Sequence, residues 1–242
     1  MALAVHSAST YDDFTAGTLD GSRWSVLELP QRRGRTWRCE DPSARTEVGE
    51  GTLDIHVEHF TRGHDRFQIF DNLKHQLVST QLFPAPRAGQ VTYSLEIAAT
   101  NLNSSFYDWR DGQASFTILD PRTGWSFRTF TTSHDIFAIH GGMWADSSTS
   151  PSSIIDCGQP WLSIQPGVSH RHDITLDFDE QSIRWRVDAA LASDISDCSL
   201  PSQVRLGLGI TTLQPILEGR SQSSRGQGLS ASFGPTTISV PA

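Results

Sequence analysis

The segment His170–Asp188, HRHDITLDFDEQSIRWRVD, constrains the fold of this chain more than any other segment. In its second half, Ile183, Trp185 and Val187 alternate with charged residues, which is the period of two expected of a half-buried β-strand. Its first half is rich in β-branched and apolar residues, and Asp179–Ser182 supplies the residue types of a tight turn. The segment therefore predicts an antiparallel hairpin.

Strand-like runs recur along the rest of the chain, with Gly and Pro residues marking turns between them. These runs are Thr52–Glu58, Gln76–Thr80, Gln90–Ala98, Gln113–Leu119, Trp125–Thr131, Asp135–His140, Arg205–Thr212 and Leu229–Val240. No window has the periodicity of an amphipathic helix. We therefore expect an all-β fold, an antiparallel jelly-roll β-sandwich in which residues 1–242 form a single domain with a flexible N-terminus at residues 1–10. A linker between two domains at Ser147–Ser153 is the competing interpretation.

Two segments resemble a known superfamily. YDDFTAGTLDGSRWSV at Tyr11–Val26 and the hairpin at His170–Asp188 are similar to the opening strand and the late hairpin of laminarinase-type jelly rolls, members of the concanavalin A-like lectin/glucanase superfamily. The resemblance implies that a concave sheet forms the binding cleft. Retaining glucanases of this superfamily carry Glu-x-Asp-x-(x)-Glu on one strand, which brings two carboxylates together on one face. This chain has no such motif.

A combination of segments spanning nearly the whole chain resembles a bacterial family without an assigned function. The segments are Tyr11–Val26, FDNLKHQLVST at Phe70–Thr80, DGQASFTILDPRTGW at Asp111–Trp125, FAIH at Phe137–His140, RLGLGITTLQP at Arg205–Pro215 and GRSQSSRGQGL at Gly219–Leu229. Members of that family often accompany polyketide and related natural-product pathways. The resemblance identifies no catalytic residue.

Composition and motifs exclude several classes of function. The net charge of −8 opposes nucleic-acid binding, which needs a basic surface, so the arginines of Gln31–Arg38 are interpreted as a solvated loop. The chain has no membrane-spanning apolar stretch and its N-terminus has no features of a secretory signal, so we expect a cytoplasmic protein. The three cysteines lack zinc spacing, His170 and His172 lack a third ligand, and no phosphate-binding motif is present. We therefore expect no metal and no cofactor.

Polar and aromatic residues in several loops and strands are candidates for a site. Histidine beside an acid can transfer protons near neutral pH, so the candidate catalytic residues are Lys74, His75, Asp111 and His140. The candidate substrate-binding residues are His59, Phe67, Tyr107, Trp109, Arg110, Gln113, Ser115, Thr117, Trp125, Phe127, Thr129 and Arg220. The competing interpretation of the loop residues is a solvated surface, and that of the aromatic residues is a place in the core.

Hydroxyl, amide and aromatic side chains suit a largely neutral ligand better than they suit glycosyl transfer. We therefore predict a cofactor-independent enzyme of natural-product (polyketide-like) biosynthesis that acts on an apolar small molecule in the concave cleft. The reaction would be an intramolecular cyclisation, such as a (4+2) cycloaddition, or an isomerisation, since both can be promoted by preorganisation and by donors that polarise a carbonyl. The alternatives are a lectin-like glycan-binding module and a glycoside hydrolase or polysaccharide lyase with atypical catalytic residues. The expected partner is a small-molecule substrate, with no nucleic acid and no membrane.

Overall fold

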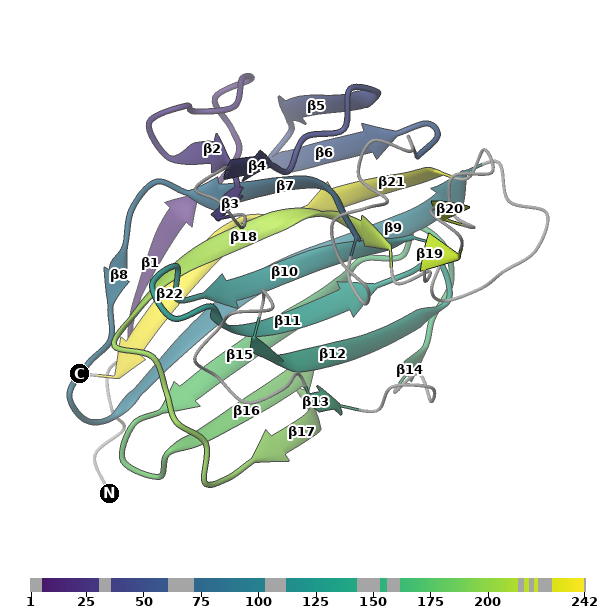
Figure 1. The fold of residues 1–242 in the computed structure, drawn as a ribbon. Coiled ribbons are helices and arrows are strands. Elements are labelled where there is room, and N and C mark those ends of the chain that lie inside the picture. Colours follow the sequence, from purple (N-terminus) through teal and green to yellow (C-terminus); the bar gives the residue numbers. More distant parts are fainter. Residues whose placement is uncertain are drawn as a thin grey trace.

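The computed structural model describes residues 6–30, 36–60, 72–102, 112–142, 153–155, 162–212, 216–217, 220–221 and 228–241. These residues form strands and turns and contain no helix, as Figure 1 shows. None of the described residues belongs to a helix that could cross a membrane. The prediction of an all-β chain is confirmed.

The strands of the described residues are numbered in their order along the chain. They are β1 (His6–Asp12), β2 (Trp24–Val26), β3 (Glu28–Pro30), β4 (Thr36–Arg38), β5 (Ala44–Gly49), β6 (Thr52–Val57), β7 (Asn72–Ser79), β8 (Phe83–Pro84), β9 (Gln90–Leu102), β10 (Gln113–Leu119), β11 (Trp125–Thr131), β12 (Asp135–Gly142), β13 (Ser153–Ile155), β14 (Leu162–Ser163), β15 (His170–Asp177), β16 (Ser182–Val187), β17 (Ala190–Ile195), β18 (Gln203–Thr212), β19 (Ile216–Leu217), β20 (Arg220–Ser221), β21 (Gly228–Phe233) and β22 (Thr236–Pro241).

Two antiparallel sheets pack against each other as a sandwich (Figure 1). Sheet A has the strand order β17-β16-β15-β9-β21-β6-β5, and β22 joins it by pairing with both β9 and β1. Sheet B has the order β13-β12-β11-β10-β18-β7-β2, with β14 beside β12 and β8 beside β18. The hairpins β3–β4 and β19–β20 stand outside both sheets. This arrangement is the antiparallel sandwich that the sequence predicts.

The hairpin expected at His170–Asp188 is present as β15 and β16. Its turn is held by the Asp177 carboxylate, whose Oδ1 accepts the backbone N–H groups of Asp179 and Glu180 at 3.1 Å. Gln181 has a positive φ of 49°, which completes the reversal of the chain. The chain therefore turns between β15 and β16, where the sequence predicts a tight turn.

The run Leu229–Val240, which the sequence suggested as one strand, is two strands. Gly234 and Pro235 separate β21 from β22. Proline has no backbone N–H for a ladder, so the run breaks there. As a result, β21 pairs with β6 and β9, whereas β22 pairs with β1 and β9.

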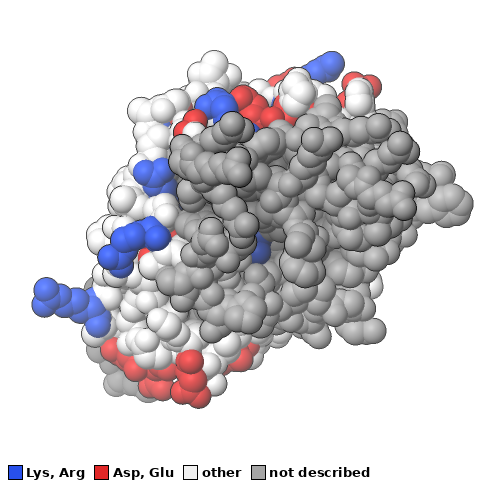
Figure 2. Space-filling view, viewed as in Figure 1, with Lys and Arg blue, Asp and Glu red and all other residues white. Residues whose placement is uncertain are grey.

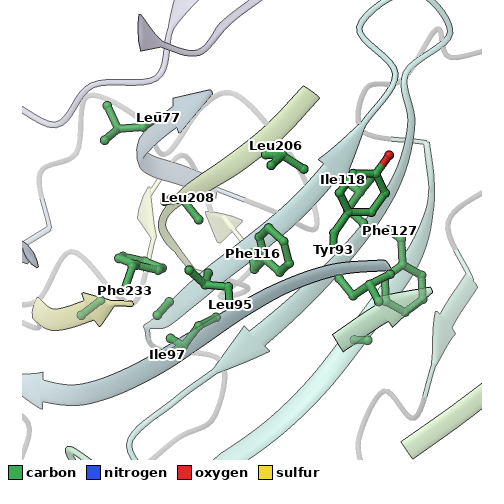
Figure 3. Packing of buried hydrophobic residues seen from close by; sticks show 14 of the residues in the cluster. Leu77, Tyr93, Leu95, Ile97, Phe116, Ile118, Phe127, Leu206, Leu208 and Phe233 are labelled. Atoms are coloured by element: carbon green, nitrogen blue, oxygen red, sulfur yellow. The ribbon is translucent and has the colours of Figure 1, made fainter. Parts of the chain in front are cut away.

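One hydrophobic core lies between the two sheets. Figure 3 shows Phe116 of β10 close to Leu95 of β9, so residues of sheet B meet residues of sheet A. Trp24 and Trp185 are buried in this core. The Trp24 Nε1–H donates a hydrogen bond to Asp12 Oδ2 at 2.8 Å, so the first strand is fastened to the core by a polar contact.

An imidazole ring lies inside the core. His172 of β15 is fully buried, its ring stacks on Trp185 at a centroid distance of 6.1 Å, and its Nε2 lies 3.1 Å from Thr131 Oγ1. Burial lowers the pKa of His172 to about 3, so the ring is neutral at physiological pH. Its neighbour His170 instead pairs with Asp188, with Nδ1 2.6 Å from Oδ2.

Candidate functional site

The face of sheet B that points away from the core is a second buried surface. One face of an antiparallel sheet is commonly solvated, but side chains at the centre of this face are as buried as the core. We define the outer face as the residues Gln76, Val78, Gln113, Ser115, Thr117, Leu119, Ser126, Arg128, Phe130, Phe137, Ile139 and Thr211. Figure 2 views the molecule from this side, and the described acidic side chains visible there gather at its upper and lower margins.

Amide and hydroxyl groups form a hydrogen-bonded strip across the outer face. The Thr211 hydroxyl of β18 donates to Gln113 Oε1 of β10 at 3.1 Å. The Ser115 hydroxyl of β10 contacts Gln76 Oε1 of β7 at 3.2 Å and the Gly209 carbonyl at 3.3 Å. The strip therefore joins three neighbouring strands, β7, β18 and β10.

Two glycines of β18 allow the Gln76 side chain to lie across that strand. A Cβ at Gly209 would overlap the His75 carbonyl oxygen and lie 2.8 Å from Gln76 Cα. A Cβ at Gly207 would lie 3.1 Å from Gln76 Nε2 and 3.2 Å from Thr117 Cβ. Glycine in a strand interior often marks such a close approach. The two glycines thus make room for the polar strip.

Arg128 of β11 adds a buried positive charge beside this strip. It is the cross-strand neighbour of Thr117 on β10 and of Ile139 on β12, and only 3% of its surface is exposed. Its guanidinium carbon lies 5.8 Å from the centroid of the Phe130 ring. Burial lowers the pKa of Arg128 to about 10, so the group remains positive at neutral pH. Such a group can bind or polarise a carbonyl or carboxylate oxygen.

Apolar clusters flank the polar strip on both sides. One cluster lies on β11 and β12 and consists of Phe130, Phe137 and Ile139. The other consists of Leu27, Leu29, Cys39, Val78 and Leu119. Burial raises the pKa of the Cys39 thiol to about 12, so this group acts as an apolar side chain. A few polar groups between apolar walls are typical of small-molecule sites.

Carboxylates are scarce on the outer face. Among the described outward positions of β7, β10, β11, β12 and β18, Asp135 alone is acidic, and it stands at the first position of β12. Burial raises the pKa of its carboxyl. Retaining glycosidases need two carboxylates about 5 Å apart. The described part of this face therefore does not offer that pair.

Three predicted binding residues lie on the outer face. Gln113, Ser115 and Thr117 point the same way, as their alternation along β10 indicates, and all three are buried. Their contact with a ligand stays a prediction.

Three other predicted binding residues lie on the opposite side of sheet B, and this corrects their assignment to the cleft. Trp125 and Phe127 belong to the core between the sheets, and Thr129 is on the same face of β11. Strand β11 carries aromatic residues on both faces, with Phe130 pointing outward. A period of two separates the faces but does not show which of them meets sheet A.

Two predicted catalytic histidines also face away from the outer face. His75 of β7 is buried, and its Nε2 lies 3.4 Å from Thr46 Oγ1 of β5, in sheet A. The His140 ring contacts Trp125 and Phe127 at centroid distances of 5.5 and 6.3 Å, and burial lowers the pKa of His140. Both assignments to the cleft are therefore corrected, because the strand faces on which they lie point toward the interior.

The remaining predicted residues are exposed or lie outside the described part of the chain. His59 is exposed just after β6, and its carbonyl accepts a hydrogen bond from the Ser43 hydroxyl at 3.0 Å. The backbones of Lys74 and Arg220 belong to β7 and β20, whereas their side chains are not described. The residues outside the described ranges are Phe67, Tyr107, Trp109, Arg110 and Asp111.

Sequence reasoning missed the residues that complete the strip. Arg128 and Gln76 lie in predicted strands but were not assigned to the site, and Thr211 and the two glycines of β18 were not singled out. The sequence RLGLGI at 205–210 carries a signal, since glycine at alternate positions leaves one face of a strand bare. Pairing with β7 is needed to show that Gln76 fills this space.

A groove with a volume of about 310 Å³ lies apart from the outer face. It is lined by Ser9, Thr10, Tyr11, Ser22, Arg23, Thr80, Gln81, Phe83 and Ile238. Its polar groups bond one another: the Tyr11 hydroxyl donates to the Arg23 carbonyl at 2.5 Å, and Arg23 Nη1 donates to the Tyr11 carbonyl at 2.6 Å. These contacts hold β1 against the turn that precedes β2, so the polar groups of the groove have a structural role. The outer face of sheet B is therefore the better candidate for a binding site.

Among the described residues, His, Cys, Asp and Glu side chains form no group of three or more that could hold a metal ion. The expectation of a metal-free and cofactor-free protein stays a prediction.

Sequence comparison places the chain in a family rather than with a characterised protein. Residues 11–242 match the model of a family described as "Family of unknown function (DUF6081)". No curated protein is significantly similar in sequence.

Several solved structures share the fold. An endo-1,3-β-glucanase from Streptomyces sioyaensis aligns with a TM-score of 0.61 and 11% identity over 97% of each chain. A β-1,3-1,4-glucanase (lichenase) from a mouse hindgut metagenome gives a TM-score of 0.57 and 13% identity over 98% of this chain and 99% of that chain. An endo-β-1,3-glucanase from Pyrococcus furiosus gives a TM-score of 0.53 and 12% identity over 99% of this chain and 95% of that chain. These likenesses confirm the concanavalin-like glucanase fold, and at such identities they show the fold alone.

Proposed function

This chain belongs to DUF6081, a family of unknown function, and we propose that it binds a small, largely apolar molecule on the outer face of sheet B and promotes its intramolecular cyclisation or isomerisation without a cofactor. The observation that carries this proposal is the buried polar strip with Arg128 beside it, between two apolar clusters. A sandwich needs only its inner faces to be apolar and buried, so the burial of polar groups on an outer face is not a requirement of the fold.

The chemistry of the strip suits a substrate that carries a carbonyl group. Arg128 and the side-chain amides are hydrogen-bond donors, and donors in a water-excluded site stabilise charge that develops on an oxygen. The apolar clusters would hold the hydrocarbon part of the substrate in a reactive conformation, which lowers the barrier of an intramolecular reaction. A place in polyketide-like biosynthesis is part of this proposal and rests on the sequence resemblance.

Cyclisation and isomerisation leave the mass of the substrate unchanged, and this property provides the test. The protein is incubated with metabolite extracts of polyketide-producing bacteria, and liquid chromatography with mass spectrometry follows each compound. We expect a compound to be replaced by another of identical mass but different retention, and heat-denatured protein should give no conversion. Extracts that remain unchanged with the native protein would contradict the enzymatic part of the proposal.

Glycan binding is a second candidate, supported by the glucanase fold of the neighbours and by the hydroxyl and amide groups of the strip. Calorimetric titration with β-1,3- and β-1,4-glucan oligosaccharides separates the two candidates. The first predicts no binding heat, and the second predicts saturable binding that weakens when Gln113 is replaced by leucine. Release of reducing sugar from the same glucans would instead support an atypical glycoside hydrolase.

A further inference from the structure

Two buried polar atoms on neighbouring side chains of the outer face make no hydrogen bond. Gln76 Nε2 and Thr117 Oγ1 are both inaccessible to solvent and have no hydrogen-bond partner. Leaving a buried donor without a partner is costly, and native proteins contain few such groups. Two of them beside each other therefore indicate a place where a ligand atom completes the bonding.

Gly207 of β18 lies next to both side chains. A Cβ built on Gly207 would be 3.1 Å from Gln76 Nε2 and 3.2 Å from Thr117 Cβ, so both side chains lie in close contact with this glycine and near each other. The Oε1 atom of the Gln76 amide already accepts a hydrogen bond from the Ser115 hydroxyl at 3.2 Å. This bond leaves the Nε2 donor over Gly207 and beside Thr117, without a hydrogen-bond partner.

We propose that these two side chains form an oxygen-binding subsite, in which Gln76 Nε2–H and the Thr117 hydroxyl donate to one carbonyl oxygen of the ligand. The proposal rests on the proposed function and narrows its substrate class to a neutral compound whose carbonyl group lies beside an apolar body. Both side-chain donors are uncharged, which suits a carbonyl oxygen that gains partial negative charge during reaction. Arg128, the cross-strand neighbour of Thr117, adds a positive charge to the same part of the outer face.

The test uses two fluorescent probes with the same ring system. The ketone 6-propionyl-2-(dimethylamino)naphthalene emits at longer wavelength when its carbonyl accepts a hydrogen bond, and 2-(dimethylamino)naphthalene lacks the carbonyl. Wild-type protein should bind the ketone more tightly than the control arene. Thr117→Val should weaken ketone binding about fivefold, the scale of one neutral hydrogen bond, and should shift the bound emission to shorter wavelength. Gly207→Ala, which places a methyl group against Gln76 Nε2 and Thr117, should abolish the preference for the ketone.

Thr129→Val is the matched control. Thr129 Oγ1 is also buried without a hydrogen-bond partner, but it lies on the opposite face of sheet B. Both valine variants keep the side-chain shape and remove a hydroxyl, so both should unfold at a temperature equal to or higher than wild type. Only Thr117→Val should change the binding of the ketone, while binding of the control arene should remain unchanged in both.

The outcomes separate the subsite from the proposed function. Equal binding of the two probes, wild-type ketone binding by Thr117→Val, or an equal loss in Thr129→Val would overturn the subsite alone. A lower unfolding temperature for Thr117→Val would also overturn it, because the hydroxyl would then be a structural group. If neither probe binds the wild-type protein, the proposed function fails and the subsite fails with it.

Discussion

The buried imidazole of His172 should make the stability of this protein fall steeply in mild acid. The ring is fully buried against Trp185, and its pKa in the folded protein is about 3. The pKa of histidine in an unfolded chain is about 6.5. Above that value both states are neutral at this site and His172 adds no pH dependence. As the pH falls below it, the unfolded state takes up a proton that the folded state excludes.

The magnitude follows from the difference in bound protons. Between the two pKa values, each pH unit lowers the free energy of unfolding by about 1.4 kcal/mol for one group. Lowering the pH from about 7 to about 5 should therefore cost about 2 kcal/mol through His172 alone. This is a large part of the stability of a typical domain, about 5–15 kcal/mol.

The assay measures urea unfolding at a series of pH values, with tryptophan fluorescence as the readout. His172→Phe keeps an aromatic ring against Trp185 but cannot take up a proton, so its free energy of unfolding should depend less on pH by about 2 kcal/mol over the same range. His59→Gln, at an exposed position, serves as the control and should behave as wild type. If His172→Phe and wild type lose equal stability between these pH values, the imidazole is solvated or charged in the folded protein and the reasoning is wrong.

Two further predictions concern packing. Gly209→Ala should lower the free energy of unfolding by about 3 kcal/mol or more, because its Cβ would overlap the His75 carbonyl. Gly21→Ala is the control, since the space around its new methyl group is open. It should change the free energy of unfolding by less than about 0.5 kcal/mol in the same urea titration. Trp125→Ala should cost about 3–5 kcal/mol of stability and leave ketone-probe affinity unchanged at temperatures where the variant is folded, since Trp125 lies in the core. Weaker probe binding with wild-type stability would instead return Trp125 to the site.

The strands of this protein are predictable because their sequences carry the signal locally. Gln113–Leu119 and Trp125–Thr131 are bounded by residues that favour turns, and both coincide with β10 and β11. The turn between them is fixed by Asp120, whose carboxylate accepts the Arg122 N–H at 2.9 Å and the Thr123 hydroxyl at 2.9 Å. Local bonding of this kind needs no tertiary information.

The site is less predictable because it depends on which strands become neighbours. Alternation along β10 groups Gln113, Ser115 and Thr117, but only the pairing of β18 with both β10 and β7 brings Gln76 to them. Strand β11 carries aromatic residues on both faces, so its sequence does not show which face points toward the core. For this reason Trp125 was expected in the site and Arg128 was not. The order of strands in a sheet is a non-local property, and a single sequence shows it only weakly.

A crystal structure of the protein with the ketone probe bound would show whether the outer face of sheet B is the binding site. We predict that the probe binds on the outer face of sheet B, with its ring system between the two apolar clusters and its carbonyl oxygen within hydrogen-bond distance of Gln76 Nε2 and Thr117 Oγ1. An ordered water molecule held at that point in the presence of the probe, or a probe bound in the groove beside Tyr11 or on sheet A, would contradict it.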